Sequence, residues 1–164
     1  MANEQQFKLR TRFIATRGVK EYRATISSVV TSTDVVLELG CEWGSTTQLI
    51  AQQAFRVIGT DISADCIRRA RLLHPTLHFE VLDAFDVRAA LELGIAFTKI
   101  YMDLSGFSGY RSLLDAIALM TMYATVLRPE TIVIKSGAVK HFAAHCHAFS
   151  WNLSPQVQET PFEE

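Results

Sequence analysis

The stretch that most constrains the fold reads V-V-L-E-L-G-C-E-W-G-S-T-T and covers residues 35–47. An apolar, β-branched run carries an acid, Glu38, and two closely spaced glycines, Gly40 and Gly44, then lead into a helical pattern. A strand, a glycine turn and a helix in this order are typical of the first unit of a nucleotide-binding α/β sheet. The next apolar run ends at Asp61, 23 residues after Glu38. An acid about 20 positions beyond such a turn binds ribose hydroxyls in doubly wound folds, so the spacing predicts a ribose-bearing ligand.

Apolar runs and helical patterns alternate along the rest of the chain. Short, nearly continuous apolar runs predict strands at residues 35–39, 56–60, 77–81, 98–103 and 131–135, and this character suits parallel strands that are buried on both faces. Apolar residues at helical spacing predict helices at 45–54, 64–73, 87–93 and 110–127. Right-handed crossovers turn this succession into a Rossmann-like doubly wound parallel sheet with helices on both faces. The expected strand order is 3-2-1-4-5, counting the predicted strands along the chain.

The length of 164 residues fits one domain, and the charge distribution suggests how it is divided. The first 25 residues carry a net charge of +4 and the remainder carries −5. We therefore expect a basic N-terminal arm or helix at residues 1–30 and a ligand-binding domain at 31–164. Clustered Lys and Arg side chains neutralise the phosphates of nucleic acids; the alternative is a solvated helix or tail with no partner.

Several classes of protein are disfavoured by the sequence. No apolar run approaches the roughly 20 residues that a membrane span needs, and the start lacks a signal-peptide pattern. The odd number of cysteines, three, contains no CxxC pair, which favours reduced thiols and a cytoplasmic location. His141 and His145 have the spacing of a metal-binding pair on a helix, but no acidic residue lies nearby, so no metal site is expected.

The residues at the predicted strand ends suggest a family. Four of the five ends carry an acid, and the set comprises Glu38, Gly40, Asp61, Asp83, Asp103 and Lys135. Together they resemble the class I S-adenosylmethionine-dependent methyltransferases over residues 35–137. The resemblance implies S-adenosylmethionine as cofactor. It also implies that Glu38, Gly40 and Gly44 hold its methionine part, that Asp61 binds its ribose hydroxyls, and that its adenine contacts Ile62, Asp83 and Ala84.

Two alternatives stay open for the glycine turn. A dinucleotide needs the pattern G-x-G-x-x-G for its pyrophosphate, whereas this chain has only Gly40 and Gly44 with the negative Glu42 between them. This disfavours a dehydrogenase. Glu42 also departs from the methyltransferase pattern, in which that position is usually small, and the departure favours a noncatalytic cofactor-binding or interaction module of the same fold as the alternative to an enzyme.

Candidate catalytic residues come from a second, weaker resemblance. Lys20, Asp103 and Lys135 occupy places similar to those of the lysine, aspartate and lysine in FtsJ-type and fibrillarin-type RNA 2′-O-methyltransferases. The resemblance implies an RNA 2′-hydroxyl as methyl acceptor, with RNA also bound by the basic arm. A lysine whose pKa is lowered by burial can deprotonate such a hydroxyl. The alternatives are a snorkelling lysine at 135, a surface charge at 20, and a small-molecule acceptor in place of RNA.

The end of the chain carries an expectation about assembly. After the last helical pattern only residues 151–164 remain, too few for the antiparallel edge hairpin that usually completes this sheet. The fifth predicted strand would then be an open edge, where an oligomer or a partner chain pairs.

Overall fold

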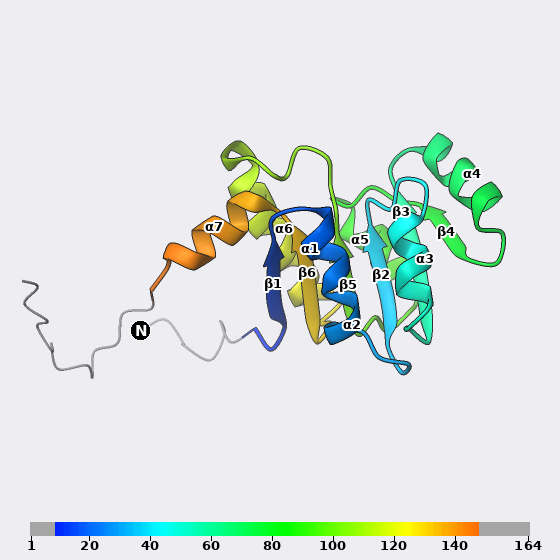
Figure 1. Ribbon diagram of the computed structural model, residues 1–164, viewed down its shortest axis with the longest axis horizontal. Helices are drawn as coiled ribbons and strands as arrows, with labels where there is room; N and C mark the ends of the chain where they lie inside the picture. Colours follow the sequence, from blue (N-terminus) through cyan, green and yellow to red (C-terminus); the bar gives the residue numbers. More distant parts are fainter. Residues whose placement is uncertain (1–8, 148–164) are drawn as a thin grey trace, which may run out of the picture.

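One sheet of six parallel strands forms the centre of the protein (Figure 1). The computed structural model describes residues 9–147. The strands in chain order are β1 (Arg12–Thr16), β2 (Val35–Leu39), β3 (Arg56–Asp61), β4 (His78–Val81), β5 (Lys99–Met102) and β6 (Thr131–Lys135). Their order across the sheet is β1-β6-β5-β2-β3-β4. The predicted fold class is confirmed, and the strand order differs from the expected one by the additional strand β1.

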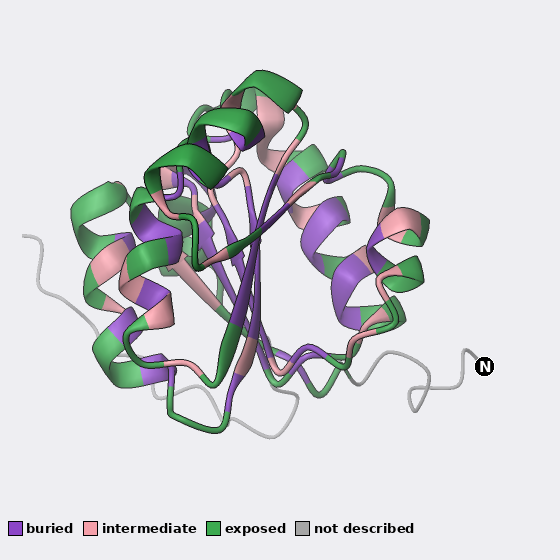
Figure 2. Cartoon of the chain, turned by 90° about the vertical axis from the view of Figure 1, so that its right-hand side faces the viewer, coloured by how far each residue is buried: buried purple, intermediate pink, exposed green. Residues whose placement is uncertain are grey.

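Helices cover both faces of the sheet, and their buried residues face it (Figure 2). One face packs against α1 (Val19–Ala24), α2 (Ile26–Val29), α3 (Ser45–Ala51) and α4 (Ala64–Leu73). The other packs against α5 (Val87–Glu92) and α6 (Leu113–Val126), the latter preceded by the 3₁₀ turn η2 (Tyr110–Ser112). The last helix, α7 (Gly137–His145), contacts α6 and β1.

Alternation along the central strands decides which side chains reach which layer. In β2, Val36 joins the apolar cluster under α1 and α3, whereas Leu37 and Leu39 join the cluster under α5 and α6. Successive side chains of a strand point to opposite faces, so Glu38 lies on the α1 and α3 face. By the same alternation from Tyr101 and Val133, the side chains of Asp103 and Lys135 lie on that face too.

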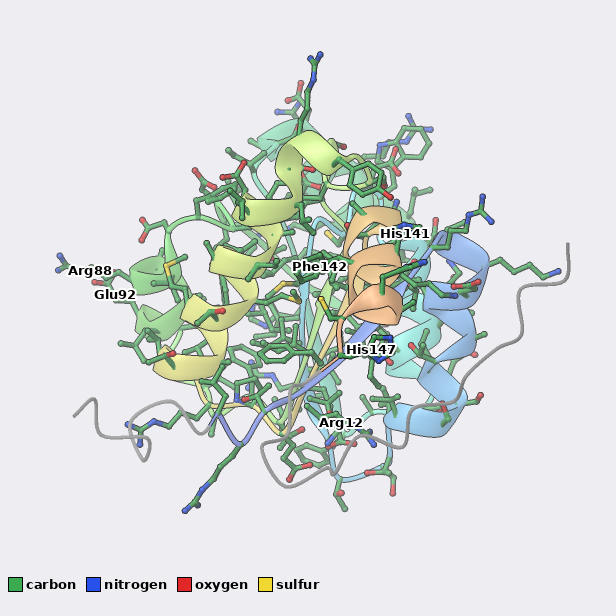
Figure 3. The ribbon with its side chains drawn as sticks, turned by 90° about the vertical axis from the view of Figure 1, so that its left-hand side faces the viewer. Arg12, Arg88, Glu92, His141, Phe142 and His147 are labelled. Carbon is green, nitrogen blue, oxygen red and sulfur yellow. The ribbon has the colours of Figure 1, made fainter. Side chains whose placement is uncertain are left out.

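The strand β1 corrects the expectation of an open edge beside the fifth predicted strand. β1 pairs in parallel with β6, and Thr16 lies opposite Lys135. The edge expectation is wrong because β1, from the chain's own N-terminal region, pairs with the backbone groups of β6 that face this edge. Figure 3 views the molecule from this edge, with Arg12 of β1 at the end opposite His141 of α7. Residues 151–164 lie outside the described residues, and the division of the chain at residue 30 stays a prediction.

The predicted element boundaries differ from the observed ones by a few residues. β2, β6 and α4 have the expected limits, whereas the predicted helix at 45–54 ends at Ala51 and that at 110–127 begins with η2. Within residues 9–147, no helix is long and apolar enough to cross a membrane.

Candidate functional site

A cavity of about 640 Å³ opens where the carboxyl ends of the central strands meet. In open parallel sheets ligands bind at this edge, next to the point where strand order reverses. Here β2 is that point, with β3 on one side and β5 on the other. The cavity is lined by Gly40, Glu42, Asp61, Ile62, Ser63, Cys66, Leu82, Asp83, Ala84, Phe85, Asp103, Leu104, Ser105, Phe107 and Lys135.

Gly40 forms the part of the cavity where two strand ends come closest. Its φ is +82°, and a Cβ built on it would lie 2.1 Å from the carbonyl oxygen of Asp103. Both the left-handed backbone and this close approach require glycine. Gly44 lies outside the lining: with φ of +84° it precedes α3, and a Cβ there would lie 2.7 Å from the ring of Phe79. Gly40 therefore shapes the cavity, whereas Gly44 packs the turn against β4.

Asp61 is held in place by two backbone amides. Its Oδ2 accepts a hydrogen bond from the Glu42 N–H at 3.0 Å, and its Oδ1 accepts one from the Ser63 N–H at 2.9 Å. A carboxylate has about four acceptor sites, so both oxygens can still accept from a ligand hydroxyl. Glu42 takes a left-handed φ of +50° and lines the cavity. The neighbouring Trp43 does not line it, and its ring lies against the guanidinium of Arg69 at 3.8 Å.

The loop after β4 supplies both polar and apolar lining. Asp83 accepts a hydrogen bond from the Phe85 N–H through Oδ1 at 2.9 Å. This leaves its Oδ2 available to accept from another donor. Ala84 is buried, whereas the side chains of Ile62 and Phe85 are largely exposed, at 68% and 54%. Two exposed apolar side chains in the lining of one cavity are suited to cover a flat apolar ligand.

Asp103 and Lys135 form an ion pair at the other end of the cavity. Both side chains are partly exposed, at 20% and 25%. Asp103 follows β5, and its N–H donates to the carbonyl of Leu39. The loop beyond it is fixed by Ser136, whose buried hydroxyl donates to the Phe107 carbonyl at 2.5 Å. The two predicted catalytic residues at 103 and 135 thus lie together in the cavity.

Glu38 and Lys20 are placed outside the cavity lining. Glu38 is only 1% exposed, and its carboxylate accepts a hydrogen bond from the Thr47 hydroxyl at 2.5 Å. Burial raises the pKa of Glu38 to about 7; the charge of Asp103 adds to the shift, and the Thr47 hydrogen bond opposes it. Lys20 is exposed on α1. The roles expected for these two residues stay predictions.

The cavity is anionic. Its lining includes the carboxylates of Glu42, Asp61, Asp83 and Asp103, whereas Lys135 is its one basic lining residue. Because Lys135 is paired with Asp103, the other three carboxylates have no cation among the lining residues. Such a cavity attracts a positively charged ligand and repels a pyrophosphate.

Comparison with known protein families shows to which family this chain belongs. A family model described as a methyltransferase domain matches residues 36–130, more than half of the chain. The chain belongs to this methyltransferase family. The matched region runs from β2 to the residue before β6 and includes every cavity-lining residue except Lys135. This match confirms the predicted family and, with it, S-adenosylmethionine as the family's cofactor.

Solved structures are similar to this chain at low identity. DesVI of Streptomyces venezuelae is 22% identical, with a TM-score of 0.55 over 71% of this chain and 51% of that one. An S-adenosylmethionine-dependent methyltransferase of Mesorhizobium loti is 19% identical, with a TM-score of 0.47 over 69% and 48%. A TehB-like methyltransferase of Corynebacterium glutamicum is 20% identical, with a TM-score of 0.44 over 60% and 53%. The chain spans about half the length of these structures. No curated protein sequence matches it significantly.

The methyltransferase cavity contains residues that the sequence did not single out. Phe85 directly follows the predicted Asp83 and Ala84, and this adjacency was the available signal. Cys66 lines the cavity from α4, where it resembles any small apolar helix residue. In the described part of the chain, no group of three or more His, Cys, Asp and Glu side chains is arranged to hold a metal.

Proposed function

We propose that this chain binds S-adenosylmethionine in the cavity and transfers its methyl group to a hydroxyl oxygen beside Asp103. The observation that carries the proposal is the convergence of Gly40, Asp61, Asp83 and Asp103 on one anionic cavity. These residues come from four different strand ends. When bound, S-adenosylmethionine supplies a methyl group on a positively charged sulfur, and a cationic ligand suits the uncompensated carboxylates.

The residues present fit this cofactor from its adenine to its ribose. Asp61 keeps free acceptor sites on both oxygens for two ribose hydroxyls. The free oxygen of Asp83 can accept from the adenine amine, and the N–H of Ala84 can donate to a ring nitrogen. Ile62 and Phe85 offer apolar surface to the base. Gly40 lines the cavity, and its lack of a side chain lets the turn pack against the Asp103 carbonyl.

Asp103 is the group that we expect to contact the acceptor. Its carboxylate can accept the hydrogen bond of an incoming hydroxyl and so orient the oxygen. As the oxygen gains the methyl group, the carboxylate would take up the hydroxyl proton and S-adenosylhomocysteine would leave; Lys135 holds the carboxylate through the ion pair. This assigns Lys135 a positioning role. To act as a base instead, its ammonium would first have to lose a proton while in contact with a carboxylate. Positioning and proton acceptance by one side chain typically contribute about 10²- to 10⁴-fold to a rate.

The choice between RNA and a small molecule as acceptor follows the placement of the basic residues. Arg12 begins β1 and Arg17 directly follows it, about 16 Å further along the chain. Among the basic residues of the described part of the N-terminal region, Arg17, Lys20 and Arg23 come after β1, whose carboxyl end lies at the edge where the cavity opens, whereas Arg10 and Arg12 lie at or before its amino end. This split favours a small acceptor over a long RNA segment. The noncatalytic alternative is supported by Glu42, whose charged side chain lines the cavity.

Calorimetry with S-adenosylmethionine tests the binding step. We expect binding by the unmodified chain and a loss of about tenfold or more in Asp61→Asn, because one hydrogen-bond acceptor for the ribose becomes a donor. Asp65→Asn is the matched control, since Asp65 is an exposed carboxylate on the adjacent α4 and is paired only with Arg68. No binding at millimolar cofactor, or equal losses in both variants, would falsify the proposal.

Methyl transfer separates the enzyme from the noncatalytic module. The purified chain is given total RNA, or a set of small hydroxyl compounds, and formation of S-adenosylhomocysteine is measured. Activity that falls at least 100-fold in Asp103→Asn while cofactor binding persists supports the enzyme. Cofactor binding without turnover on either class of acceptor favours the module.

A further inference from the structure

Lys135 lines the cavity from β6, the strand next to β1, and a pair of turns lies directly beside it. Thr16 lies opposite Lys135, and the Ser136 N–H donates to the Thr16 carbonyl at 2.9 Å. The turn after β1 and the turn after β6 are therefore joined directly beside Lys135. Because β1 leads into α1 and α1 contacts β6, the start of α1 lies over the same end of β6.

Arg17 lies across this junction. Its carbonyl oxygen and its Cγ are 3.8 Å and 3.9 Å from the position that a Cβ on Gly137 would occupy, and the Ser108 carbonyl is 3.7 Å from the same position. Gly137, two residues after Lys135, thus lies close to both the turn that carries Arg17 and the loop that follows Asp103. A group that leaves the cavity past Lys135 meets this surface.

The charges on this surface are mostly positive. Glu21 is the acid here, and it is already engaged: its Oε2 accepts from the Arg17 N–H at 2.9 Å and from the Lys140 ammonium at 2.7 Å. The side chains of Arg17 and Lys20 are exposed, and within residues 9–147 neither forms an ion pair. Arg17, Lys20 and Lys140 together outnumber Glu21, so the surface carries excess positive charge.

This surface is positively charged, whereas the part of the cavity proposed to bind the cofactor is negatively charged. The lining there carries Glu42, Asp61 and Asp83 without a cation, whereas the surface past Lys135 has free cations and an engaged acid. Asp103 and Lys135, paired with each other, lie between the two. Negative charge on one side of this ion pair and positive charge on the other favour a cationic ligand on the first side and an anionic one on the second.

We propose that the methyl acceptor carries an anionic group, a carboxylate or a phosphate, next to its reacting hydroxyl, and that Arg17 and Lys20 bind this group. The proposal rests on the proposed function, whose cofactor occupies the other end. The planar guanidinium of Arg17 can bind two oxygens of a carboxylate or phosphate at once, and Lys20 adds a second positive charge. Lys20 is then an acceptor-binding residue and does not take part in the proton transfer.

Titration with inorganic phosphate and with acetate, followed by NMR of the backbone amides at constant ionic strength set with chloride, tests the site in the full chain. We expect saturable shifts of the amides of Arg17, Gly18 and Gly137. The dissociation constant should rise about 2- to 5-fold in Arg17→Gln, because the cations are exposed, and about tenfold in Arg17→Gln/Lys20→Gln. Tighter binding of phosphate assigns a phosphorylated acceptor, and equal or tighter binding of acetate assigns a carboxylate.

The control comes from the same strand. Arg12→Gln removes an exposed arginine at the far end of β1 and should leave the titration unchanged (Figure 3). Equal effects of Arg12→Gln and Arg17→Gln, or no binding beyond that of chloride, overturn the proposal. Calorimetry with S-adenosylmethionine on the same samples keeps the two ideas apart: the variants should bind it as the unmodified chain does, and a chain that binds the anion but no S-adenosylmethionine contradicts the proposed function alone.

Discussion

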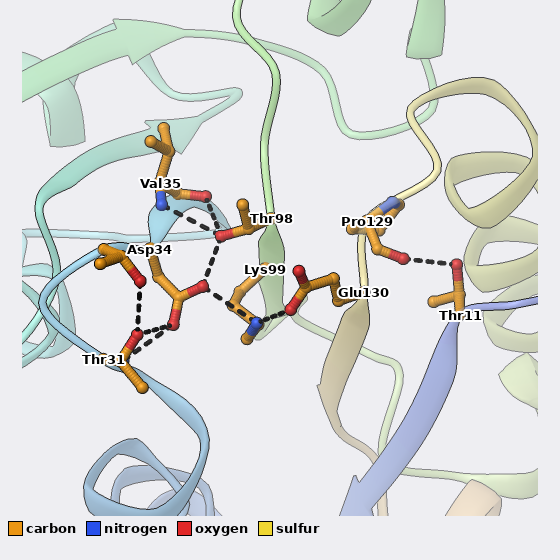
Figure 4. A network of polar contacts seen from close by, with 9 residues as sticks. Thr11, Thr31, Asp34, Val35, Thr98, Lys99, Pro129 and Glu130 are labelled. Carbon is orange, nitrogen blue, oxygen red and sulfur yellow. Dashed lines mark hydrogen bonds and ion pairs between the residues drawn. The ribbon is translucent and has the colours of Figure 1, made fainter.

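Two buried carboxylates lie at opposite ends of β2 and have very different numbers of hydrogen-bond partners. Asp34 directly precedes the strand and Glu38 lies near its carboxyl end; they are 4% and 1% exposed. Asp34 accepts hydrogen bonds from the Thr31 N–H, the Thr31 and Thr98 hydroxyls and the Lys99 ammonium (Figure 4). Glu38 accepts one, from Thr47.

Because their hydrogen-bond partners differ, the pKa values of the two carboxylates shift in opposite directions. Burial alone raises the pKa of both groups, but for Asp34 the hydrogen bonds from Thr98, Lys99 and Thr31 outweigh it and lower the pKa to about 2. For Glu38 burial prevails and the pKa rises to about 7. The buried charge at the amino end of β2 is therefore compensated and stabilises the sheet. At the carboxyl ends Glu38 has no ion-pair partner among the described residues, and neither do the cavity carboxylates Glu42, Asp61 and Asp83, as is typical of a ligand site.

The largest expected effect is the loss of the cation at the amino ends. Lys99 has an 8% exposed side chain and contacts Asp34 at 2.9 Å and Glu130 at 2.5 Å. Lys99→Met leaves Asp34 buried without a cation, which should lower the free energy of unfolding by about 3–5 kcal/mol, measured by urea denaturation. Arg88→Met, which breaks the exposed pair with Glu92 (Figure 3), should change it by less than about 0.5 kcal/mol. Similar losses of unfolding free energy in both variants would contradict the assignment of Lys99 as the cation that compensates the buried Asp34.

Replacing Gly40 tests the carboxyl ends by steric means. In Gly40→Ala the new Cβ would lie 2.1 Å from the Asp103 carbonyl, so the turn must move. We expect a loss of about 3 kcal/mol in unfolding free energy, together with lost S-adenosylmethionine binding in calorimetry. Gly94 also has a left-handed φ, +66°, but nothing lies within 4 Å of its added Cβ. Gly94→Ala should cost only the backbone strain of about 1 kcal/mol and keep cofactor binding; equal costs would show that contact with Asp103 is unimportant.

Much of this architecture follows from local sequence. The strands β2 and β6 were predictable to the residue because apolar, mostly β-branched residues dominate both, and Asp34 and Gly40 bound the first while Glu130 and Ser136 bound the second. Three acids at the carboxyl edge, Asp61, Asp83 and Asp103, were predictable as a group because parallel topology brings these strand ends together.

Features that depend on long-range pairing were not predictable. β1 was missed because basic residues flank and begin it and because its partner, β6, is more than a hundred residues away. Glu38 was expected in the cavity, yet it lies inside β2, is only 1% exposed and is hydrogen-bonded to Thr47 of α3. The ion pair of Lys99 with Asp34 was not predictable, since the two residues are distant in sequence and no local pattern connects them.

The pH dependence of stability distinguishes the two carboxylates directly. Glu38 binds a proton more strongly in the folded chain, where its pKa is about 7, than at its ordinary value of 4.5. Its contribution to stability is therefore full below about pH 4.5 and is lost as the pH rises through 7, by about 2–3 kcal/mol. Glu38→Gln should remove this fall when urea unfolding is measured from pH 5 to pH 8. Asp34 acts in the reverse sense: its contribution is present above pH 3.8 and is lost as the pH falls toward 2. Parallel curves for Glu38→Gln and the unmodified chain would contradict the assignment.

The smallest expected change in stability comes from Lys135, the lysine at the cavity end. Its pair with Asp103 is partly exposed on both sides, so Lys135→Met should lower the unfolding free energy by less than about 1 kcal/mol. Methyl transfer should nevertheless fall about 100-fold, mainly in kcat, because Asp103 loses the contact that orients it. Adding Asp103→Asn should then cost little more than Asp103→Asn alone. If Lys135→Met destabilises the chain as much as Lys99→Met does, the two ends of the sheet hold the same kind of structural ion pair, and the positioning role assigned to Lys135 is contradicted.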